Sequence, residues 1–417
     1  MSGTFRLPWL VLLLTVGLIA VGITFIYSGT TGTHLDGLAA RQALSAGMAL
    51  PLLLLVACVP PAKLSRSAGF LFVAMLGGLV AVLFVGIEIN YARRWFQGPA
   101  GFLIQPSELA KPVFVLVVAR FLTLRGEARR LGTLLGLVAI IALPFLLIRA
   151  QPDLGTALIF VPVVAGMAFT AGARRTWYLV ALVIGLVGAS ALYQSPLLED
   201  YQKERVRTFL VSIPERTAQA QEARRDGEYR RASAIEYEIQ EIKRNAGYQS
   251  HIAQTSIGSG GWFGKGLGQG PQNRLRTLPE RHNDFIFSVI AEETGWVGCA
   301  ALLAGYLLLG VAILQVASAT RDSFGRLICV GAALFLNTQA FANVAMNTGL
   351  LPITGMPLPF VSQGGSSMMS SLALVGMVVA VARTRHFDEP FSYTTGPLPD
   401  PFGFRAVDAS RKRLRFH

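Results

Sequence analysis

The sequence predicts an all-α polytopic membrane protein with ten transmembrane helices, and two observations support that fold class. Of the 417 residues, 52% are hydrophobic and only 15% are charged, which is too apolar for a soluble domain. Several uncharged apolar runs also reach the ~18 to 20 residues that a helix needs to cross the bilayer core. Runs such as 10–20 and 131–148 are continuously apolar, whereas the strands of a transmembrane barrel alternate apolar and polar residues.

Hydropathy and polar breaks place the expected spans in order along the chain. They cover roughly residues 8–28, 42–60, 68–88, 108–124, 132–148, 154–172, 176–193, 285–316, 327–345 and 366–382. The first run is about twenty residues long, and no small-residue cleavage pattern follows it. We therefore expect a retained first helix and a single membrane domain over residues 1–417.

The distribution of basic residues predicts the orientation. If the N-terminus is cytoplasmic, the inside segments hold 17 Lys and Arg residues and the short outside connections hold four. Both termini are then cytoplasmic, including a basic tail at 384–417 that is suited to contact with membrane lipid. This asymmetry explains much of the net charge of +13 without a nucleic-acid partner.

One long segment, residues 194–283, is expected to form a large extracytoplasmic loop. Its part from Pro214 to Asn245 is rich in Ala, Arg, Glu and Gln, which predicts a solvated helical hairpin or a partner-docking surface. A glycine-rich stretch, 256–270, follows it. Ser259 and Gly266 stand where a Walker A motif requires Gly and Ser or Thr, so that motif is rejected. A loop that offers backbone N–H groups to a phosphate or a sugar remains open.

Ionisable side chains are costly at membrane depth, and few occur here. Glu108 and Lys111 open the fourth span on one helix face, after Pro106 and Ser107. They form either a neutralised pair that joins helices or a site that positions a charged substrate, and the helix N-terminus favours an anion.

Asp153 opens the sixth span, where it either caps the helix or requires a cationic partner. The candidate partners are Arg93, Arg94, Lys111 and Arg149. Arg94 precedes Trp95, and a planar cation beside an aromatic ring suits phosphate and sugar contact. An interfacial anchor is the alternative explanation for Trp95.

The segment 278–287 holds the densest group of titratable residues. Asp284 stands at the expected start of the eighth span, close to Glu280 and His282 and before an apolar wall at 285–287. An N-cap aspartate is one interpretation, and a general base shielded from water is the other. The last outside loop, 351–367, is stiffened by prolines, and Ser366 or Ser367 is expected to cap the tenth helix.

Taken together, these motifs resemble the SEDS family (shape, elongation, division and sporulation). The matching segments are 94–95, 105–111, 151–157, 256–266, 278–287 and 349–360, in that order. Leu351-Pro-Ile-Thr-Gly and the glycine stretch look more like the rod-shape branch than the division branch. Asn283 and Gln363 depart from the Thr and Tyr that are usual in the family at these positions.

The resemblance implies a ten-helix peptidoglycan glycosyltransferase of the bacterial cytoplasmic (inner) membrane. It implies lipid II and the growing glycan strand as substrates and a class B penicillin-binding protein as partner. Asp284 matches the family's catalytic aspartate, and Glu108, Lys111 and Asp153 match its membrane-embedded polar positions. The expected substrate-binding residues are Glu108, Lys111, Asp153, Arg94, Trp95, Glu280, His282 and Ser366.

Charge on a leaving diphosphate could be compensated by Arg94, Lys111, Arg281 or a divalent cation, Mg or Mn. No metal-ligand set is assigned, and Cys58, Cys299 and Cys329 indicate neither a disulfide framework nor a zinc site. A flippase of the lipid-linked precursor and a non-catalytic scaffold are the alternative functions. Transport would need polar residues spread across the membrane, whereas the candidates cluster toward the outer side.

Overall fold

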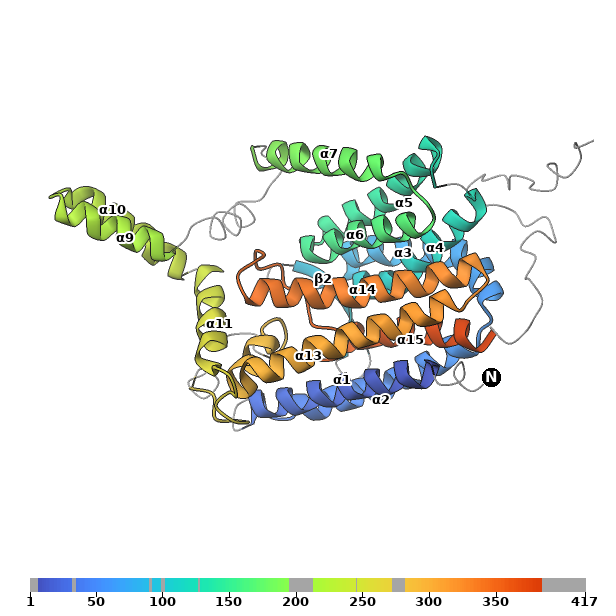
Figure 1. Ribbon diagram of the computed structural model, residues 1–417, viewed down its shortest axis with the longest axis horizontal. Coiled ribbons are helices and arrows are strands. Elements are labelled where there is room, and N and C mark those ends of the chain that lie inside the picture. Colours follow the sequence, from blue (N-terminus) through green and yellow to red (C-terminus); the bar gives the residue numbers. More distant parts are fainter. Residues whose placement is uncertain are drawn as a thin grey trace, which may run out of the picture.

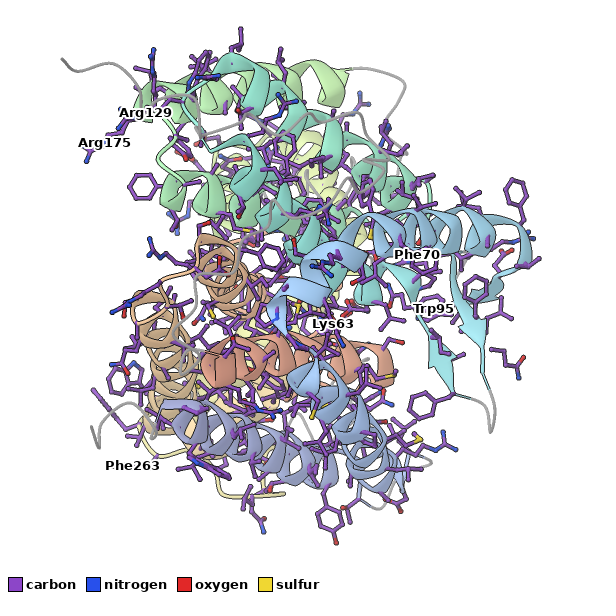
Figure 2. The ribbon with its side chains drawn as sticks, turned by 90° about the vertical axis from the view of Figure 1, so that its right-hand side faces the viewer. Lys63, Phe70, Trp95, Arg129, Arg175 and Phe263 are labelled. Carbon is purple, nitrogen blue, oxygen red and sulfur yellow. The ribbon has the colours of Figure 1, made fainter. Side chains whose placement is uncertain are left out.

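The computed structural model describes residues 7–31, 35–89, 92–98, 102–126, 128–194, 213–244, 246–271 and 282–384. Long helices lie roughly side by side and form a bundle, as Figure 1 shows. Figure 2 looks onto the end of the bundle that carries Lys63, Arg129 and Arg175, which belong to three of the predicted inside loops.

A helix lies in each of the ten predicted segments, although the third ends at Val85 and residues 87–88 of that segment belong to a strand. The helices are α1 (Leu7–Thr30), α2 (Leu38–Cys58), α3 (Pro61–Val85), α4 (Pro106–Arg125), α5 (Leu131–Arg149), α6 (Leu154–Thr170), α7 (Arg175–Gln194), α13 (Ile286–Ser318), α14 (Ser323–Asn347) and α15 (Gly365–Thr384). Seven of the described helices are long and apolar enough to cross a membrane, namely α1, α2, α3, α5, α13, α14 and α15. The chain is therefore a multi-pass helical membrane protein.

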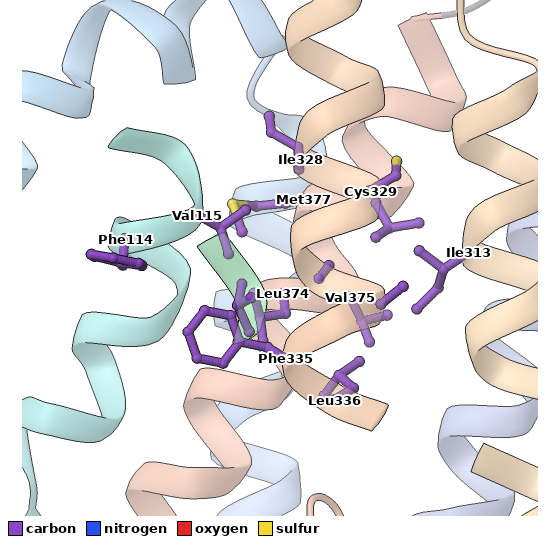
Figure 3. Packing of buried hydrophobic residues seen from close by; sticks show 14 of the residues in the cluster. Phe114, Val115, Ile313, Ile328, Cys329, Phe335, Leu336, Leu374, Val375 and Met377 are labelled. Carbon is purple, nitrogen blue, oxygen red and sulfur yellow. The ribbon is translucent and has the colours of Figure 1, made fainter. Parts of the chain in front are cut away.

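The centre of the bundle is formed by α14 and α15. Most residues of these two helices are buried, whereas most residues of α1, α2, α3 and α5 face outward. Figure 3 shows Phe335 of α14 beside Val115 of α4 and Leu374 of α15 within this apolar core. Polar residues on α14 are consequently surrounded by protein, so each one needs a hydrogen-bond partner inside the fold.

Three short antiparallel strands connect α3 to α4. Strand β1 (Ile87–Ile89) pairs with β2 (Ala92–Gln97), which pairs with β3 (Leu103–Ile104). The sequence did not predict these strands and placed residues 87–88 in the third span, because strands of two to six residues lie within one hydropathy window. The sheet holds Arg94 and Trp95 on β2, close to the start of α4.

The charged part of the large loop forms the predicted hairpin. Helices α9 (Ile213–Arg225) and α10 (Tyr229–Arg244) pack through Ala220, Ile235 and Ile239. An ion pair of 2.8 Å joins Arg224 Nη2 to Glu236 Oε2 across the two helices. The hairpin projects from the bundle, and α11 (Ala246–Gly260) runs across the ends of the bundle helices (Figure 1).

Candidate active site

Asp284 lies in the turn before α13, and its side chain is partly exposed. The N-cap residue of α13 is Phe285, so the interpretation of Asp284 as an N-cap is wrong. A Cβ atom at Gly355 would lie 3.4 Å from Oδ2 of Asp284. The carboxylate therefore lies against the last outer loop.

Two asparagines of α14 hold the main chain of Asp284. The Nδ2 groups of Asn343 and Asn347 donate to the Asp284 carbonyl over 2.9 and 3.0 Å. Asn343 Nδ2 also donates to the Met356 carbonyl over 2.7 Å. Ser288 Oγ donates to Asn347 Oδ1 over 2.7 Å, which fixes the orientation of that amide. Both asparagines are fully buried.

The last outer loop joins the same network. Ser362 Oγ donates to the Asn283 carbonyl over 2.7 Å, and the Gln363 N–H donates to the His282 carbonyl over 3.0 Å. The buried Gln42 of α2 donates to the Ser362 carbonyl over 2.9 Å. We call Asp284, Asn343, Asn347 and Ser362 the loop cluster. Neutral side chains in this cluster tie two loops into one unit around a partly exposed carboxylate.

Glu108 and Lys111 pair as the sequence predicted. Lys111 Nζ lies 2.6 Å from Glu108 Oε1, and both residues are buried, with 2% and 3% of their surface exposed. Lys111 also donates to Gln339 Oε1 over 2.8 Å, and Gln339 Nε2 donates to the Pro357 carbonyl over 2.7 Å. The pair thus joins α4 to α14 and to the last outer loop. Glu108 Oε2 is buried without a hydrogen-bond partner.

Asp153 is the N-cap of α6, as one of the two interpretations proposed. Its Oδ1 accepts from the Thr156 N–H over 3.3 Å, and its Oδ2 accepts from Gln105 Nε2 over 3.0 Å. Of the four candidate cations, Arg94 supplies the recorded ion pair, with Nη1 3.9 Å from Asp153 Oδ1. We call Glu108, Lys111, Asp153 and Arg94 the charged cluster.

Arg94 and Trp95 lie together on β2. The guanidinium of Arg94 lies 5.4 Å from the centre of the Trp95 ring, within the range of a cation–π contact. Nε of Arg94 is buried without a hydrogen-bond partner, although about a quarter of the side chain is exposed. Figure 2 shows Trp95 on the strands beside α3, the helix that carries Phe70. The Arg94 side chain and Trp95 are both partly exposed, so this pair is accessible to a ligand.

Ser366 has a different role from the expected one. Helix α15 begins at Gly365, so Ser366 lies inside the first turn and is not the N-cap. Its hydroxyl donates to the Leu103 carbonyl and accepts from the Gln105 N–H, both over 2.9 Å. The residue ties β3 and the start of α4 to α15. Glu280 and Arg281 lie outside the described residues.

The polar face of α14 is the part of the site that sequence reasoning missed. Gln339, Asn343 and Asn347 are spaced four residues apart and bond successively to the Pro357, Met356 and Asp284 carbonyls. Amide side chains at i, i+4 and i+8 of an apolar helix lie on one face, so their spacing could have indicated a buried polar face. Their partners lie in distant loops, which spacing alone does not identify.

The glycine-rich stretch differs from the expected loop. Residues 256–260 belong to α11, and only residues 261–270 are non-helical. The Lys265 and Gly266 N–H groups donate to the Glu292 and Glu293 carbonyls over 2.9 and 3.0 Å. Those two amides are used by the protein itself, so they do not form the phosphate cradle that the sequence left open.

The remaining question about the site is whether its described side chains form a cluster of metal ligands. The described residues contain no group of three or more His, Cys, Asp or Glu side chains that could hold an ion. Cys58, Cys299 and Cys329 are free thiols.

The fold and site define a multi-pass helical membrane protein whose buried charges and partly exposed aspartate converge near one end of the bundle. The chain belongs to the FtsW, RodA and SpoVE family, described as "Cell cycle protein", whose model matches residues 5–386. It is 34% identical to the peptidoglycan glycosyltransferase MrdB of Escherichia coli, over 83% of this chain and 85% of the relative. It is 31% identical to the probable peptidoglycan glycosyltransferase FtsW of Halomonas elongata, over 93% and 94%.

Solved structures agree with this membership. One chain, from work described as "Structural coordination of polymerization and crosslinking by a peptidoglycan synthase complex", superposes with a TM-score of 0.73 at 31% identity. The rod shape determining protein RodA of Thermus thermophilus superposes with a TM-score of 0.63 at 28% identity. Each match covers 91% of this chain and 98% of the other.

Proposed function

We propose that this chain is a peptidoglycan glycosyltransferase that polymerises lipid II into glycan strands on the outer face of the cytoplasmic membrane, for cell elongation and rod shape. Family membership and the names of its relatives support the activity. The observation that carries the proposal is the fixed main chain of Asp284, which presents a partly exposed carboxylate between two bonded loops. We infer ten crossings with both termini cytoplasmic from the excess of Lys and Arg in alternate loops, and in that topology Asp284 faces the outer side.

In the proposed reaction Asp284 is the general base. Its carboxylate removes the proton from the 4-hydroxyl of the acceptor sugar, and that oxygen attacks the anomeric carbon of the donor. The bond from that carbon to the lipid-linked diphosphate breaks with inversion, and the diphosphate leaves with the electron pair. A positioned base of this kind contributes about 10²- to 10⁴-fold to the rate.

Of the candidate cations within the described residues, Arg94 is the one best suited to the leaving diphosphate. Its side chain is partly exposed, its Nε has no hydrogen-bond partner, and it stands 3.9 Å from Asp153. Lys111 is buried and already bonded to Glu108 and Gln339, so we assign it the role of joining α4 to the loops. A Mg or Mn ion bound to the diphosphate would supply further charge compensation, and no step depends on it.

The proposed partner is a class B penicillin-binding protein that crosslinks the new strand. A solved relative couples polymerization and crosslinking in one synthase complex, which supports such a partner.

The test is polymerisation of labelled lipid II by the purified protein together with its cognate penicillin-binding protein. Asp284→Asn keeps the side-chain size and removes the base, so glycan product should fall at least 100-fold. The matched control is Asp322→Asn, because Asp322 caps α14 at its other end and Asn caps helices equally well. Control activity should equal that of the wild type.

Two outcomes would contradict the proposal. Unchanged product from Asp284→Asn, with both variants folded and bound to the partner, would remove Asp284 from the mechanism. No product from the wild-type complex would instead favour the flippase or the scaffold, and lipid II translocation into liposomes would then separate those two.

A further inference from the structure

An aromatic patch lies on the outer end of the bundle, away from Asp284 and the charged cluster. It consists of Trp262, Phe263, Leu267 and Trp296, whose exposed fractions are 68%, 82%, 57% and 62%. The two indole rings meet edge to face with centroids 5.3 Å apart. Phe263 lies at the periphery of the molecule in Figure 2, on the opposite side from Trp95. We call these four residues the outer aromatic patch.

The backbone that carries the patch is fixed. Gly295 interrupts α13 with φ 68° and ψ −163°, a conformation that is essentially restricted to glycine. The loop after α11 supplies the hydrogen bonds that the break removes. Trp296 N–H donates to the Gly261 carbonyl over 2.8 Å, and Val297 N–H donates to the Trp262 carbonyl over 3.1 Å. The large side chains therefore point outward from an ordered support.

The length of α13 locates the patch relative to the membrane. The helix continues from the break at Gly295 to Ser318, about 24 residues or ~36 Å, which is slightly more than the ~30 Å hydrocarbon core. Helix α1 ends beside the same point, because Ser28 Oγ donates to the Glu293 carboxylate over 2.7 and 2.8 Å. The patch lies where two spanning helices leave the hydrocarbon core.

We propose that the outer aromatic patch is a membrane anchor that inserts into the interface of the outer leaflet. Tryptophan prefers this layer because its ring is apolar and its N–H is polar. Lys265, exposed in the same loop, is suited to reach the lipid phosphates from there. The anchor holds the end of α11 against the bilayer and so supports the base of the α9–α10 hairpin (Figure 1). This inference rests on the proposed topology for its choice of leaflet, and it does not depend on the proposed catalytic activity.

Continuity with the lipid-facing surface argues for lipid as the occupant. Exposed apolar side chains of α13 continue from the patch toward the other end of the helix at Val297, Leu307, Val311 and Leu314. Their spacing keeps them on one helix face. This surface begins with a Trp pair suited to the membrane interface and continues as an apolar stripe about as long as the hydrocarbon core. That order matches the layers of a bilayer.

The test places a fluorophore on the patch. A protein with Cys58, Cys299 and Cys329 replaced by Ala receives Phe263→Cys, is labelled with an NBD dye and is reconstituted into phosphatidylcholine and phosphatidylglycerol vesicles. Tyr237→Cys on α10 is the matched control, since Tyr237 is 69% exposed on the hairpin. We expect the dye at position 263 to show blue-shifted emission. Lipids with a shallow nitroxide should quench it at least twofold more than lipids with a deep nitroxide. The dye at position 237 should show neither effect.

Two results would overturn the proposal. Water-like emission at 263 without lipid quenching would mean that the patch faces solvent. Blue-shifted emission without lipid quenching would mean that protein covers it, either a second copy or a partner. A second measurement keeps the native cysteines and uses brominated lipid as a quencher of tryptophan fluorescence. The fluorescence intensity lost to quenching should be smaller in Trp262→Phe than in the wild type. An equal loss in both proteins would also overturn the anchor.

Discussion

The loop cluster and the charged cluster lie at the same end of the bundle but use their polar groups differently. In the loop cluster, neutral amides and a hydroxyl bond to main-chain carbonyls, and the one carboxylate stays partly exposed. In the charged cluster, Glu108 and Lys111 are buried and bond to each other. The loop cluster fixes backbone geometry for a reactive group, whereas the charged cluster joins helices.

This difference has an energetic consequence. Removing one member of a buried ion pair leaves an uncompensated charge, and its cost exceeds that of an unpaired neutral group. Removing an amide that bonds to a carbonyl costs less but releases a loop. Variants of the buried Glu108–Lys111 pair should therefore affect stability first, and variants of the loop cluster should affect catalysis first.

The largest stability effect is expected for Lys111→Met. The substitution leaves the Glu108 carboxylate buried without its cation, which should lower the free energy of unfolding by about 3 to 5 kcal/mol. Titration with SDS in mixed micelles measures this value. The control is the double variant Glu108→Gln with Lys111→Met, which removes both charges and should recover most of the loss. A single variant as stable as the wild type would show that the pair does not join the helices.

Asn343→Ala should have the next largest effect on stability and a larger one on catalysis. It deprives the Met356 carbonyl of its donor and leaves the Asp284 carbonyl with Asn347 alone, at a cost of about 1 to 3 kcal/mol. Lipid II polymerisation should lose kcat with little change in KM, because Asp284 is displaced while substrate contacts remain.

The matched control for Asn343 is Asn337→Ala on the same helix. The Asn337 amide donates to the Ala333 carbonyl of its own helix over 2.9 Å and has no recorded bond to either loop. Its kcat should stay within about twofold of the wild type, because its amide bonds to its own helix. Equal losses of kcat in both variants would indicate general loosening of α14, not positioning of Asp284.

Ser362→Ala tests the other side of the loop cluster. The hydroxyl accepts from the Leu358 N–H and donates to the Asn283 carbonyl, both over 2.7 Å, so its loss should cost about 1 to 2 kcal/mol. Hydrogen exchange of the Leu358 amide should become faster. Protection equal to that of the wild type would mean that the two loops do not depend on this contact.

The smallest stability change is expected for Arg94→Lys. The ion pair with Asp153 is 3.9 Å long and the arginine side chain is partly exposed, so stability should change by less than about 1 kcal/mol. The polymerisation rate should fall although stability changes little, because lysine lacks the planar guanidinium that can donate two parallel hydrogen bonds to a diphosphate. Full activity in this variant would remove Arg94 from the substrate site.

Much of the fold could be predicted from the sequence. Helices occur in all ten predicted segments, and Pro106, Glu108 and Lys111 lie in the first turns of α4 with the charges paired. These features are local, since hydropathy depends on consecutive residues and i,i+3 contacts depend only on helix geometry. The hairpin of α9 and α10 followed for the same reason.

The site was only partly predictable. Sequence reasoning selected Asp284 but allowed it to be an N-cap, and it left four candidate cations for Asp153. It assigned Ser366 to the wrong contact and did not select Asn343 or Asn347. The partners of these residues are distant in the chain, as with Ser366 and Gln105.

The sequence by itself determined the membrane class, the helical segments and the residues able to do chemistry, because burial in lipid imposes length and composition on each span separately. Tertiary structure alone decided which carbonyl each buried amide satisfies, which arginine faces Asp153 and how the break at Gly295 is closed by the loop after α11. Buried polar groups must find partners, but which partners they find depends on how α14 packs among helices and loops far away in the sequence.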